Sequence, residues 1–442
     1  MQIAVIGSGI SGLSAAWLLS RAHAVTVFES GAHVGGHTNT VDVDTAEGRI
    51  PVDTGFIVYN EKNYPNLTAL FRHLGVETNS TRMSFALSLG DGAYEYSGSL
   101  AGFFGQAKNL VDRGHWRLFL EILQFFREAP AALERDEGPL TLGEALAKAG
   151  YSRRFIDDHL LPMGAAIWST PMDRMLQYPA ASFLRFYRNH GLLQLVGRPR
   201  WRTVDGGGRE YVRRLLADSR ADLRLGCGVK TVTRRGAEVL VEGEDGVVRR
   251  FDHVVVATHA DQALALLGDA DGFERDLLGA FGYQKNLAVL HTDKTLMPRR
   301  RRLWASWDYL KMTGGTETGL CVSYWMNSLQ KLATSTDIFV TLNPPRMPDP
   351  ALTQGSFVYD HPVFDAAAAA ARERLWHLQG RRRTWFCGSY FGDGFHEDGL
   401  QSGLAVAEQL GGVRRPWSVA EESGRIRLSP TGAGVPLPEA AE

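Results

Sequence analysis

The chain has 442 residues, more than a single hydrophobic core usually supports, so we expect two or more domains. Its net charge of −1 argues against a nucleic-acid-binding protein, because such proteins normally carry a strong basic excess. The three cysteines, Cys227, Cys321 and Cys387, are far apart and show no CxxC spacing, which predicts neither a disulfide framework nor a zinc site.

The N-terminus predicts a strand–helix–strand unit. Residues 2–6 (QIAVI) are apolar, GSGISG follows, residues 13–22 have a helical apolar pattern, and residues 24–30 predict a second strand. The apolar start carries no basic segment and is too short for a signal peptide. No stretch approaches the roughly 18 uninterrupted apolar residues of a transmembrane helix. We therefore expect a cytoplasmic protein that is soluble or, at most, peripheral at the inner face of the cell membrane.

The GSGISG turn has the glycine spacing of a dinucleotide-binding loop. Gly7 allows a tight turn, Gly9 lets a pyrophosphate approach the backbone, and Gly12 lets the helix pack closely on the strand. The start of the helix, at Ile10 and Ser11, supplies amides and a positive dipole to the phosphates. The turn therefore predicts the phosphate site of a dinucleotide.

An acidic residue ends the second strand at the spacing that dinucleotide-binding folds use. Glu29 lies about 20 residues after the glycines, where a carboxylate accepts hydrogen bonds from the adenosine ribose. We therefore expect Glu29, with the adjacent Ser30, to contact the ribose.

Beyond this unit, helical and strand patterns alternate. Residues 100–200 are helical in pattern and rich in Phe, Trp and Leu, which indicates an inserted helical domain. From residue 416 to 442 the chain is rich in Pro, Gly and Glu without periodicity, and we expect a flexible tail there. The other predicted elements are a helix over residues 63–75, a glycine turn and helix over 203–219, mixed strands and loops over 271–380, a strand within 383–394 and a closing helix over 400–412.

A second glycine pair, Gly35 and Gly36, follows Glu29. With it, the chain resembles the FAD-binding enzymes of the flavin amine oxidase and phytoene desaturase superfamily, whose N-terminal signature is GxGxxG, a glutamate, and then two glycines and an arginine. This chain has His37 where the arginine is usual. The resemblance implies that His37, followed by Thr38, contacts a phosphate or the flavin edge.

The resemblance continues along most of the chain. Residues 52–60 (VDTGFIVYN) resemble the D-x-G segment that passes the isoalloxazine ring, which implicates Gly55, Phe56 and Ile57. The strand that starts near Val229 resembles the segment whose backbone pairs with the adenine. Residues 386–410 resemble the C-terminal FAD motif, although Ser389 follows Gly388 where an acidic residue is usual.

The segment GFHEDGLQSG, residues 394–403, precedes the last apolar helix. We expect it to be the edge of the flavin site, with Asp398 and Gly399 at the N-cap and in the first turn. Amides at this helix start stabilise negative charge that develops on a reduced flavin. Glu397, Asp398 and Leu400 are then structural or cofactor ligands, and His396 borders the substrate.

We expect an α/β fold. A discontinuous Rossmann-like FAD-binding domain takes residues 1–85, 200–270 and 381–415, and an α+β substrate domain with a helical insertion takes 86–199 and 271–380. The expected catalytic residues are His396, Tyr59 and Tyr390. The expected substrate-binding residues are Asn60, Trp168, Trp304, Trp307 and Tyr324. The expected cofactor-binding residues are Gly7, Gly9, Ile10, Ser11, Gly12, Glu29, Ser30, Gly35, Gly36, His37, Thr38, Gly55, Phe56, Ile57, Val229, Gly388, Glu397, Asp398, Gly399 and Leu400. No metal-ligand spacing such as HExxH occurs, so we expect no metal.

A narrower resemblance concerns function. Residues 291–307 (HTD…MP…WASW) and GFHEDGLQSGLA resemble a bacterial group of predicted NAD/FAD-binding proteins found with cyclopropane-fatty-acyl-type lipid methyltransferases. This implies an FAD-dependent dehydrogenase or desaturase of a methyl-branched or unsaturated acyl chain, with a lipid methyltransferase as partner. The flavin accepts a hydride and is reoxidised by oxygen or a quinone-like acceptor.

Other functions stay open. The same hydride removal, followed by its return elsewhere on the chain, makes a fatty acid double-bond isomerase. An amine oxidase needs a lysine near the flavin, for which Lys285 is the candidate, and an aromatic cage. A non-catalytic flavin-binding partner of the methyltransferase is a further alternative. The four arginines of MPRRRRLWASW (297–307) are a solvated loop or a patch for anionic membrane lipids.

Overall fold

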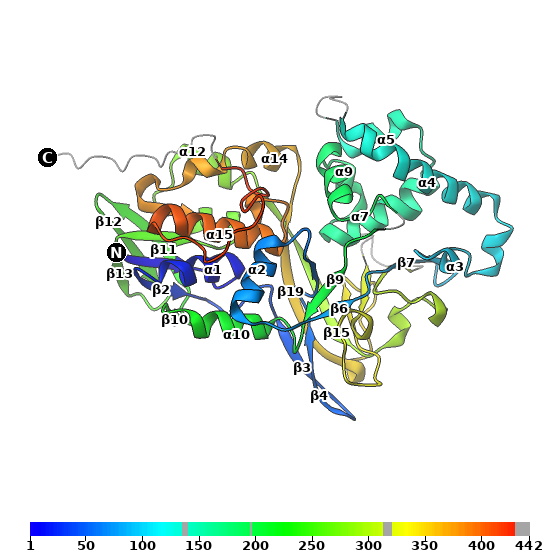
Figure 1. Cartoon of the computed structure of the whole chain (residues 1–442), viewed down its shortest axis with the longest axis horizontal. Helices are drawn as coiled ribbons and strands as arrows, with labels where there is room; N and C mark the ends of the chain where they lie inside the picture. The colour runs from blue at the N-terminus through cyan, green and yellow to red at the C-terminus, as the bar shows by residue number, and fades with distance from the viewer. Residues whose placement is uncertain (135–139, 195–196, 313–320, 429–442) are drawn as a thin grey trace.

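The computed structural model describes residues 1–134, 140–194, 197–312 and 321–428. It contains a five-stranded parallel sheet (Figure 1), and the predicted phosphate loop follows strand β1 of this sheet. All of its strands come from the three segments that the sequence assigns to the cofactor domain. The sheet order is β10-β2-β1-β14-β20, with β1 at Gln2–Ile6, β2 at Ala24–Phe28, β10 at Asp222–Arg224, β14 at His253–Val256 and β20 at Thr384–Phe386.

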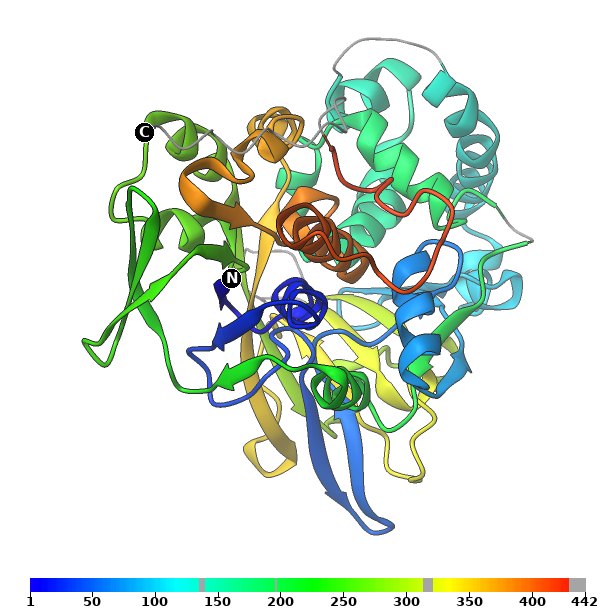
Figure 2. The same cartoon turned by 60° about the vertical axis from the view of Figure 1, so that its left-hand side comes forward.

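Two helices, α1 (Ile10–Leu19) and α15 (His396–Gly411), lie side by side against this sheet (Figure 2). Glycine makes their close approach possible, because a Cβ at Gly403 would overlap the carbonyl oxygen of Ser11. A Cβ at Gly399 would lie 3.0 Å from Ile10 Cγ2. The N-termini of both helices therefore reach the same region, where the dinucleotide and flavin ends of one cofactor are expected.

A second sheet has seven strands in the order β19-β15-β18-β17-β16-β7-β8. Its longest pair is antiparallel, with Lys285 of β15 opposite Asp360 of β19. The bounds are β7 Phe85–Leu89, β8 Tyr94–Ser97, β15 Gly282–His291, β16 Trp307–Lys311, β17 Val322–Trp325, β18 Phe339–Leu342 and β19 Thr353–Val363.

The predicted helical insertion is confirmed and lies apart from the parallel sheet in Figure 1. It packs on the seven-stranded sheet, where the Tyr309 hydroxyl of β16 donates to Met172 Sδ at 3.6 Å. Its helices are α3 Leu100–Phe103, α4 Arg113–Glu134, α5 Leu142–Ala149, α6 Arg153–Phe155, α7 Leu161–Trp168, α8 Met172–Met175 and α9 Ala180–Asn189.

Smaller elements connect these parts. A ribbon of β3 (Thr40–Thr45) and β4 (Gly48–Asp53) projects at the lower edge of Figure 1. The remaining strands are β5 Tyr59–Asn60, β6 Thr78–Thr81, β9 Trp201–Val204, β11 Val229–Arg235, β12 Glu238–Gly243 and β13 Val248–Phe251. The remaining α-helices are α2 Pro65–Leu74, α10 Arg209–Asp218, α11 Ala260–Leu266, α12 Gly272–Leu278, α13 Met326–Leu329 and α14 Ala366–Arg372. Among the described residues, no helix combines the length and apolar character needed to cross a membrane.

Two expectations for the C-terminus are wrong. Helix α15 begins at His396 rather than after Asp398, so Asp398 is the third residue of the helix. Residues 416–428 are not a loose tail: Trp417 stacks on Trp17 of α1 with ring centroids 5.8 Å apart, and Arg425 pairs with the buried Asp398. The rest of the predicted tail, residues 429–442, lies outside the described residues.

Candidate active site

The glycines of the phosphate loop have the geometry that a dinucleotide needs. Gly7 has φ +103°, and a Cβ there would lie 2.8 Å from the carbonyl oxygen of Ala257. A Cβ at Gly12 would overlap the carbonyl oxygen of Gly7. A Cβ at Gly9, in contrast, would meet no atom within 4 Å. Gly7 and Gly12 are therefore required by the protein itself, whereas the open space over Gly9 fits a pyrophosphate.

The second glycine pair lies against the phosphate loop, and the segment around Gly55 lies against the residues that follow this pair. Gly35 and Gly36 have φ values of +119° and +58°, and a Cβ at Gly36 would lie 3.1 Å from Gly9 Cα. A Cβ at Gly55 would overlap the carbonyl oxygen of His37, which accepts a hydrogen bond from the Phe56 amide at 2.8 Å. The segments predicted to contact the phosphates and the isoalloxazine ring thus lie against each other.

Glu29 lies at the end of β2 and is held by the loop itself. Its carboxylate accepts hydrogen bonds from the Ser8 amide at 2.9 Å, the Ser8 hydroxyl at 2.6 Å and the Gly31 amide at 2.7 Å. The adjacent Ser30 is exposed, and Val229 is the first residue of β11. Contacts of Glu29 and Ser30 with the ribose, and of Val229 with the adenine, stay predictions.

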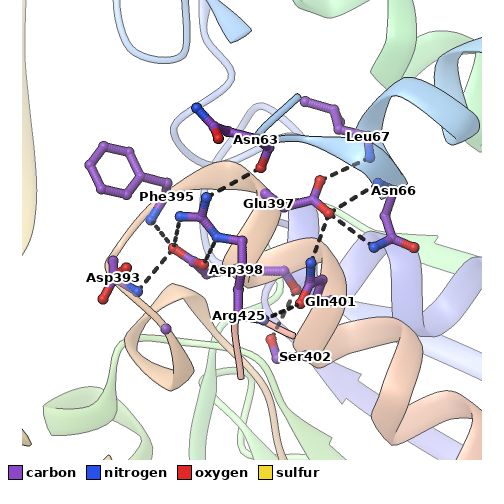
Figure 3. A network of polar contacts seen from close by, with 12 residues as sticks. Asn63, Asn66, Leu67, Asp393, Phe395, Glu397, Asp398, Gln401, Ser402 and Arg425 are labelled. Carbon is purple, nitrogen blue, oxygen red and sulfur yellow. Dashed lines mark hydrogen bonds and ion pairs between the residues drawn. The ribbon is translucent and has the colours of Figure 1, made fainter. Parts of the chain in front are cut away.

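Glu397 does not face a cofactor but joins two helices (Figure 3). Its fully buried carboxylate accepts hydrogen bonds from the amides of Asn66 at 3.0 Å and Leu67 at 2.9 Å, both in the first turn of α2. The side chains of Asn66 and Gln401 each donate to it at 2.9 Å. The expectation of a cofactor ligand is therefore corrected: all four donors belong to the protein, and Glu397 caps α2.

Asp398 is also a structural residue. Its carboxylate accepts hydrogen bonds from the amides of Phe395 at 2.8 Å and Asp393 at 3.0 Å, and it forms a 2.5 Å ion pair with Arg425 (Figure 3). An acid at the third helical position that reaches back to the residue before the helix stabilises the helix start. Asp398 therefore fixes the N-terminus of α15 rather than binding the cofactor.

His396, the first residue of α15, packs against the segment predicted to pass the isoalloxazine ring. Its ring stacks on Phe56 with centroids 3.8 Å apart, and Nε2 lies 2.7 Å from the Tyr211 hydroxyl and 3.2 Å from Thr38 Oγ1. Burial lowers the pKa of His396 to about 3, so the ring is neutral at neutral pH. A contact between His396 and the substrate stays a prediction, and its low pKa makes it a weak general base.

The other predicted catalytic and polar residues lie inside the protein. Tyr59 is 2% exposed and packs edge-on against Phe71 at 5.2 Å, and its catalytic role stays a prediction. Tyr390 is 1% exposed and packs on Phe391 at 4.9 Å. Asn60 is fully buried, and its Oδ1 accepts a hydrogen bond from the Asn63 amide at 2.9 Å. Asn60 therefore shapes the β5–α2 turn.

Of the four predicted substrate-binding aromatics, Trp307 and Tyr324 lie in the seven-stranded sheet, and Trp304 and Trp168 lie outside it. Trp304 stabilises its own loop, because its Nε1 donates to the Pro298 carbonyl at 2.7 Å, and its contact with substrate stays a prediction. Trp307 and Tyr324 pack edge-on at 5.1 Å in the seven-stranded sheet, and Trp307 Nε1 is buried without a hydrogen-bond partner. Trp168, at the end of α7, packs 4.6 Å from Phe186.

The side chains of Arg300, Arg301 and Arg302 have partners within the protein. Arg300 pairs with the fully buried Glu95 at 2.6 Å, and Arg301 pairs with Asp337 at 2.8 Å. Arg302 donates to the Gly105 carbonyl. Glu95 and Asp337 hold two of these cations in place, and contact of this segment with anionic lipids stays a prediction.

Asp53 is a buried residue that was not among the predicted site residues. It stabilises the D-x-G segment, residues 52–60, which is predicted to pass the isoalloxazine ring. Its carboxylate accepts hydrogen bonds from Thr40 Oγ1 at 2.5 Å, the Gly208 amide at 2.9 Å and Gln330 Nε2 at 2.9 Å. Burial raises the pKa of Asp53 to about 7, against the lowering effect of these donors. The D of the D-x-G pattern thus joins the β3–β4 ribbon to the start of α10.

Replacing Asp53 with asparagine is expected to flatten the pH dependence of stability. A pKa raised from 3.8 to about 7 means that the contribution of Asp53 to stability is most favourable below pH about 4 and becomes less favourable as the pH rises to 7. The loss is about 1.4 kcal/mol per pKa unit, or about 4 kcal/mol in total. Urea unfolding at pH 4, 5.5 and 7 measures it, with Asp44→Asn, exposed on the same ribbon, as the control. An unchanged slope in Asp53→Asn would contradict this titration.

Comparison with known protein families agrees with the dinucleotide-binding geometry of the phosphate loop. The family of flavin containing amine oxidoreductases matches residues 10–291, which is more than half of the chain. The chain belongs to this family. FAD is therefore its cofactor, and the protein is a flavin-dependent oxidoreductase with the α/β fold expected from the sequence. No curated protein sequence matches the chain.

Solved structures of other proteins show the same fold as this chain. A variant of putrescine oxidase is 14% identical with a TM-score of 0.67, over 93% of this chain and 99% of that chain. The CLA-producing fatty acid isomerase from P. acnes is 16% identical with a TM-score of 0.64, over 92% and 97%. Cyclohexylamine oxidase from Brevibacterium oxydans IH-35A is 16% identical with a TM-score of 0.61, over 92% and 99%.

The structure brings together three parts of the chain that suit FAD. They are the open phosphate loop, the segments 35–38 and 55–57, which contact each other through glycines, and the N-terminus of α15. Gly388 lies beside α15, because its amide donates a hydrogen bond to Ser402 Oγ at 3.0 Å and its carbonyl accepts one from the same hydroxyl at 3.1 Å. Among the residues that the structure describes, no group of three or more His, Cys, Asp and Glu side chains is arranged to hold a metal ion.

Proposed function

We propose that this flavin oxidoreductase removes a hydride from a lipid acyl chain, as a fatty-acyl dehydrogenase or desaturase. The observation that carries this proposal is the aromatic cluster on one side of Phe395, the residue before α15. Phe395, the residue before the helix, stacks on Phe186 of α9 with centroids 5.0 Å apart, and Trp168 of α7 lies against Phe186. An acyl chain is apolar along its length and suits such a lining.

Two features disfavour an amine substrate. Lys285, the candidate for the lysine that amine oxidases keep near the flavin, is exposed on β15. The two carboxylates at the start of α15, Glu397 and Asp398, are occupied by donors of the protein and cannot act as counter-ions for an ammonium group. An uncharged, apolar substrate therefore fits this region better than a cationic one.

The chain's own groups have limited roles in this proposal. Bound FAD supplies the two-electron acceptor for the hydride. The first-turn amides and the positive end of α15 stabilise negative charge near them. His396 stays neutral and is positioned by Tyr211 and Thr38, while the aromatic lining excludes water from the reacting chain.

A double-bond isomerase is the second candidate. It begins with the same hydride removal, and one structural neighbour is described as a fatty acid isomerase. The difference lies in the fate of the hydride, which returns to the acyl chain in an isomerase.

Anaerobic mixing of the holoenzyme with unsaturated and methyl-branched acyl lipids tests the proposal. Lasting bleaching of the flavin indicates a dehydrogenase, and a shifted double bond without net bleaching indicates an isomerase. Bleaching by amines alone would overturn both. Lipid profiles of a host with and without this gene, beside a lipid methyltransferase, test whether a methylated chain is the substrate.

A matched pair of variants tests whether Phe395 lines the site of the acyl chain. Phe395→Asp and Phe395→Asn both supply a favourable residue at the position before α15, so the helix start is retained. Only aspartate brings a charge into the lining, and we expect it to lower kcat/KM for the acyl substrate at least about tenfold more than asparagine does. Equal kcat/KM values would remove Phe395 from the substrate path.

A further inference from the structure

Exposed apolar side chains gather at one end of the helical insertion. Of the thirteen large apolar residues that are exposed in the described parts of the chain, five lie within residues 100–120. They are Leu100 of α3, Leu110 and Val111 between the two helices, and Trp116 and Leu120 of α4. Val111 is 83% exposed and Leu100 is 68% exposed. A concentration of this kind marks a surface that contacts a partner. We call these five residues the α3–α4 patch.

Hydrogen bonds and ring contacts join the patch into one surface. Trp116 Nε1 donates to the Leu110 carbonyl at 2.9 Å, which fixes the connecting segment to α4. Phe104 packs on the Trp116 ring with centroids 4.5 Å apart, and its amide donates to the Leu100 carbonyl at 3.4 Å. The apolar residues are therefore held in place together rather than scattered singly over the surface.

The start of α4 has two distinct faces. The buried face packs into the insertion and consists of His115, Leu118, Ile122 and Phe125. The exposed face has the same spacing of three or four residues and consists of Arg113, Trp116, Arg117 and Leu120. The exposed face of a helix in a globular protein is normally polar throughout. Cations that alternate with tryptophan and leucine are typical of a helix that lies on a membrane surface.

The exposed charged residues within residues 100–120 are all basic. They are Lys108, Arg113 and Arg117. Asp112 is the one acidic residue of this segment outside the buried side of the helix, and its carboxylate pairs with Arg154 at 2.8 Å. Arg302, exposed in the arginine loop, donates to the Gly105 carbonyl and brings a further cation to the segment. A surface with this charge complements anionic lipid head groups.

We propose that the α3–α4 patch docks this protein on the surface of a lipid bilayer that contains anionic lipids. Tryptophan prefers the head-group level of a bilayer, and apolar side chains beside it enter the boundary with the acyl chains. The patch lies at the right-hand end of Figure 1, whereas the parallel sheet lies at the left. The protein can therefore dock without contact between the bilayer and the cofactor domain.

A second copy of this chain fits the patch less well than a bilayer does. In a two-fold dimer the same surface faces itself, so Lys108, Arg113 and Arg117 would meet the same cations of the other copy. Like charges that face each other across an interface lower the affinity. An anionic bilayer instead offers phosphates to the cations and an apolar layer to Val111 and Leu120.

Co-sedimentation of the FAD-bound protein with lipid vesicles tests docking without any turnover, so the result is independent of the proposed acyl chemistry. Vesicles of phosphatidylglycerol and phosphatidylcholine in equal parts should bind the protein, and vesicles of phosphatidylcholine alone should bind it at least about tenfold more weakly. Raising the salt concentration from about 0.05 M to about 0.5 M should also weaken binding, because added ions screen the charges. Equal binding to both kinds of vesicle, or binding to neither, would overturn the proposal.

Variants locate the contact on the molecule. Val111→Asp should weaken binding to the anionic vesicles at least about tenfold, because it replaces an apolar contact with a repelled charge. Val248→Asp is the matched control, since Val248 is an exposed valine of β13 at the opposite end of the molecule, and it should bind as the wild type does (Figure 1). Lys108→Gln with Arg113→Gln should weaken binding about fivefold for each cation removed.

Thermal unfolding and the flavin content confirm that each variant is folded. Sedimentation velocity without vesicles reports whether the patch joins two copies of the chain. If Val111→Asp bound vesicles as tightly as the wild type, or if it separated a dimer that the wild type forms, the patch would not be the membrane contact.

Discussion

Replacing Arg425 with methionine is expected to lower the free energy of unfolding by about 3–5 kcal/mol and to release FAD. Arg425 pairs with Asp398, whose side chain is fully buried, and it also donates to the Asn63 carbonyl at 3.2 Å. Without Arg425, the Asp398 carboxylate stays buried without its cation. Because Asp398 fixes the start of α15, the flavin end of the cofactor site loses its order with it.

Chemical denaturation and the flavin content after gel filtration measure the two effects. Arg427→Met is the matched control, since Arg427 pairs with Glu373 on the surface with side chains 45% and 57% exposed, and it should cost at most about 1 kcal/mol. The double variant Asp398→Asn with Arg425→Met removes both charges and should recover more than half of the loss. Equal losses in the single and double variants would show that the ion pair is not the cause.

Local patterns predicted the cofactor half of the protein well. The strand–helix–strand unit and the roles of Gly7, Gly9 and Gly12 depend on a few neighbouring residues, so the sequence carries them directly. The composition of residues 416–428 lacks periodicity and therefore predicts a flexible tail. Their order comes from contacts with distant segments, such as Trp417 with Trp17 and Arg425 with Asn63, which no local pattern reveals.

Local patterns also failed to predict the partners of the acidic residues in GFHEDGLQSG, residues 394–403, where helix α15 begins. Phe395 is not one of the usual residues before a helix, so the predicted start fell at Asp398. Asp398 instead stabilises the start from inside the first turn, and Glu397 caps α2, more than 300 residues away in the sequence. Acidic residues at a cofactor helix therefore have to be assigned from their partners, since their position alone suggested cofactor ligands.

Alanine substitutions at two glycines of the phosphate loop, Gly9 and Gly12, are expected to have opposite effects on protein stability and on FAD binding. Gly9→Ala should leave the free energy of unfolding of the cofactor-free protein within about 0.5 kcal/mol, because its Cβ meets no atom within 4 Å. It should nevertheless weaken FAD binding at least about tenfold, because the methyl group occupies the space of the pyrophosphate.

Gly12→Ala should do the reverse. Its Cβ overlaps the backbone of Gly7, which cannot move aside as a flexible side chain can, so we expect a loss of several kcal/mol of stability before any cofactor is added. Unfolding curves with and without FAD distinguish the two variants. If Gly9→Ala bound FAD as tightly as the wild type, the open space over Gly9 would not be the pyrophosphate site. The contrast therefore tests the position of the cofactor without relying on turnover of any substrate.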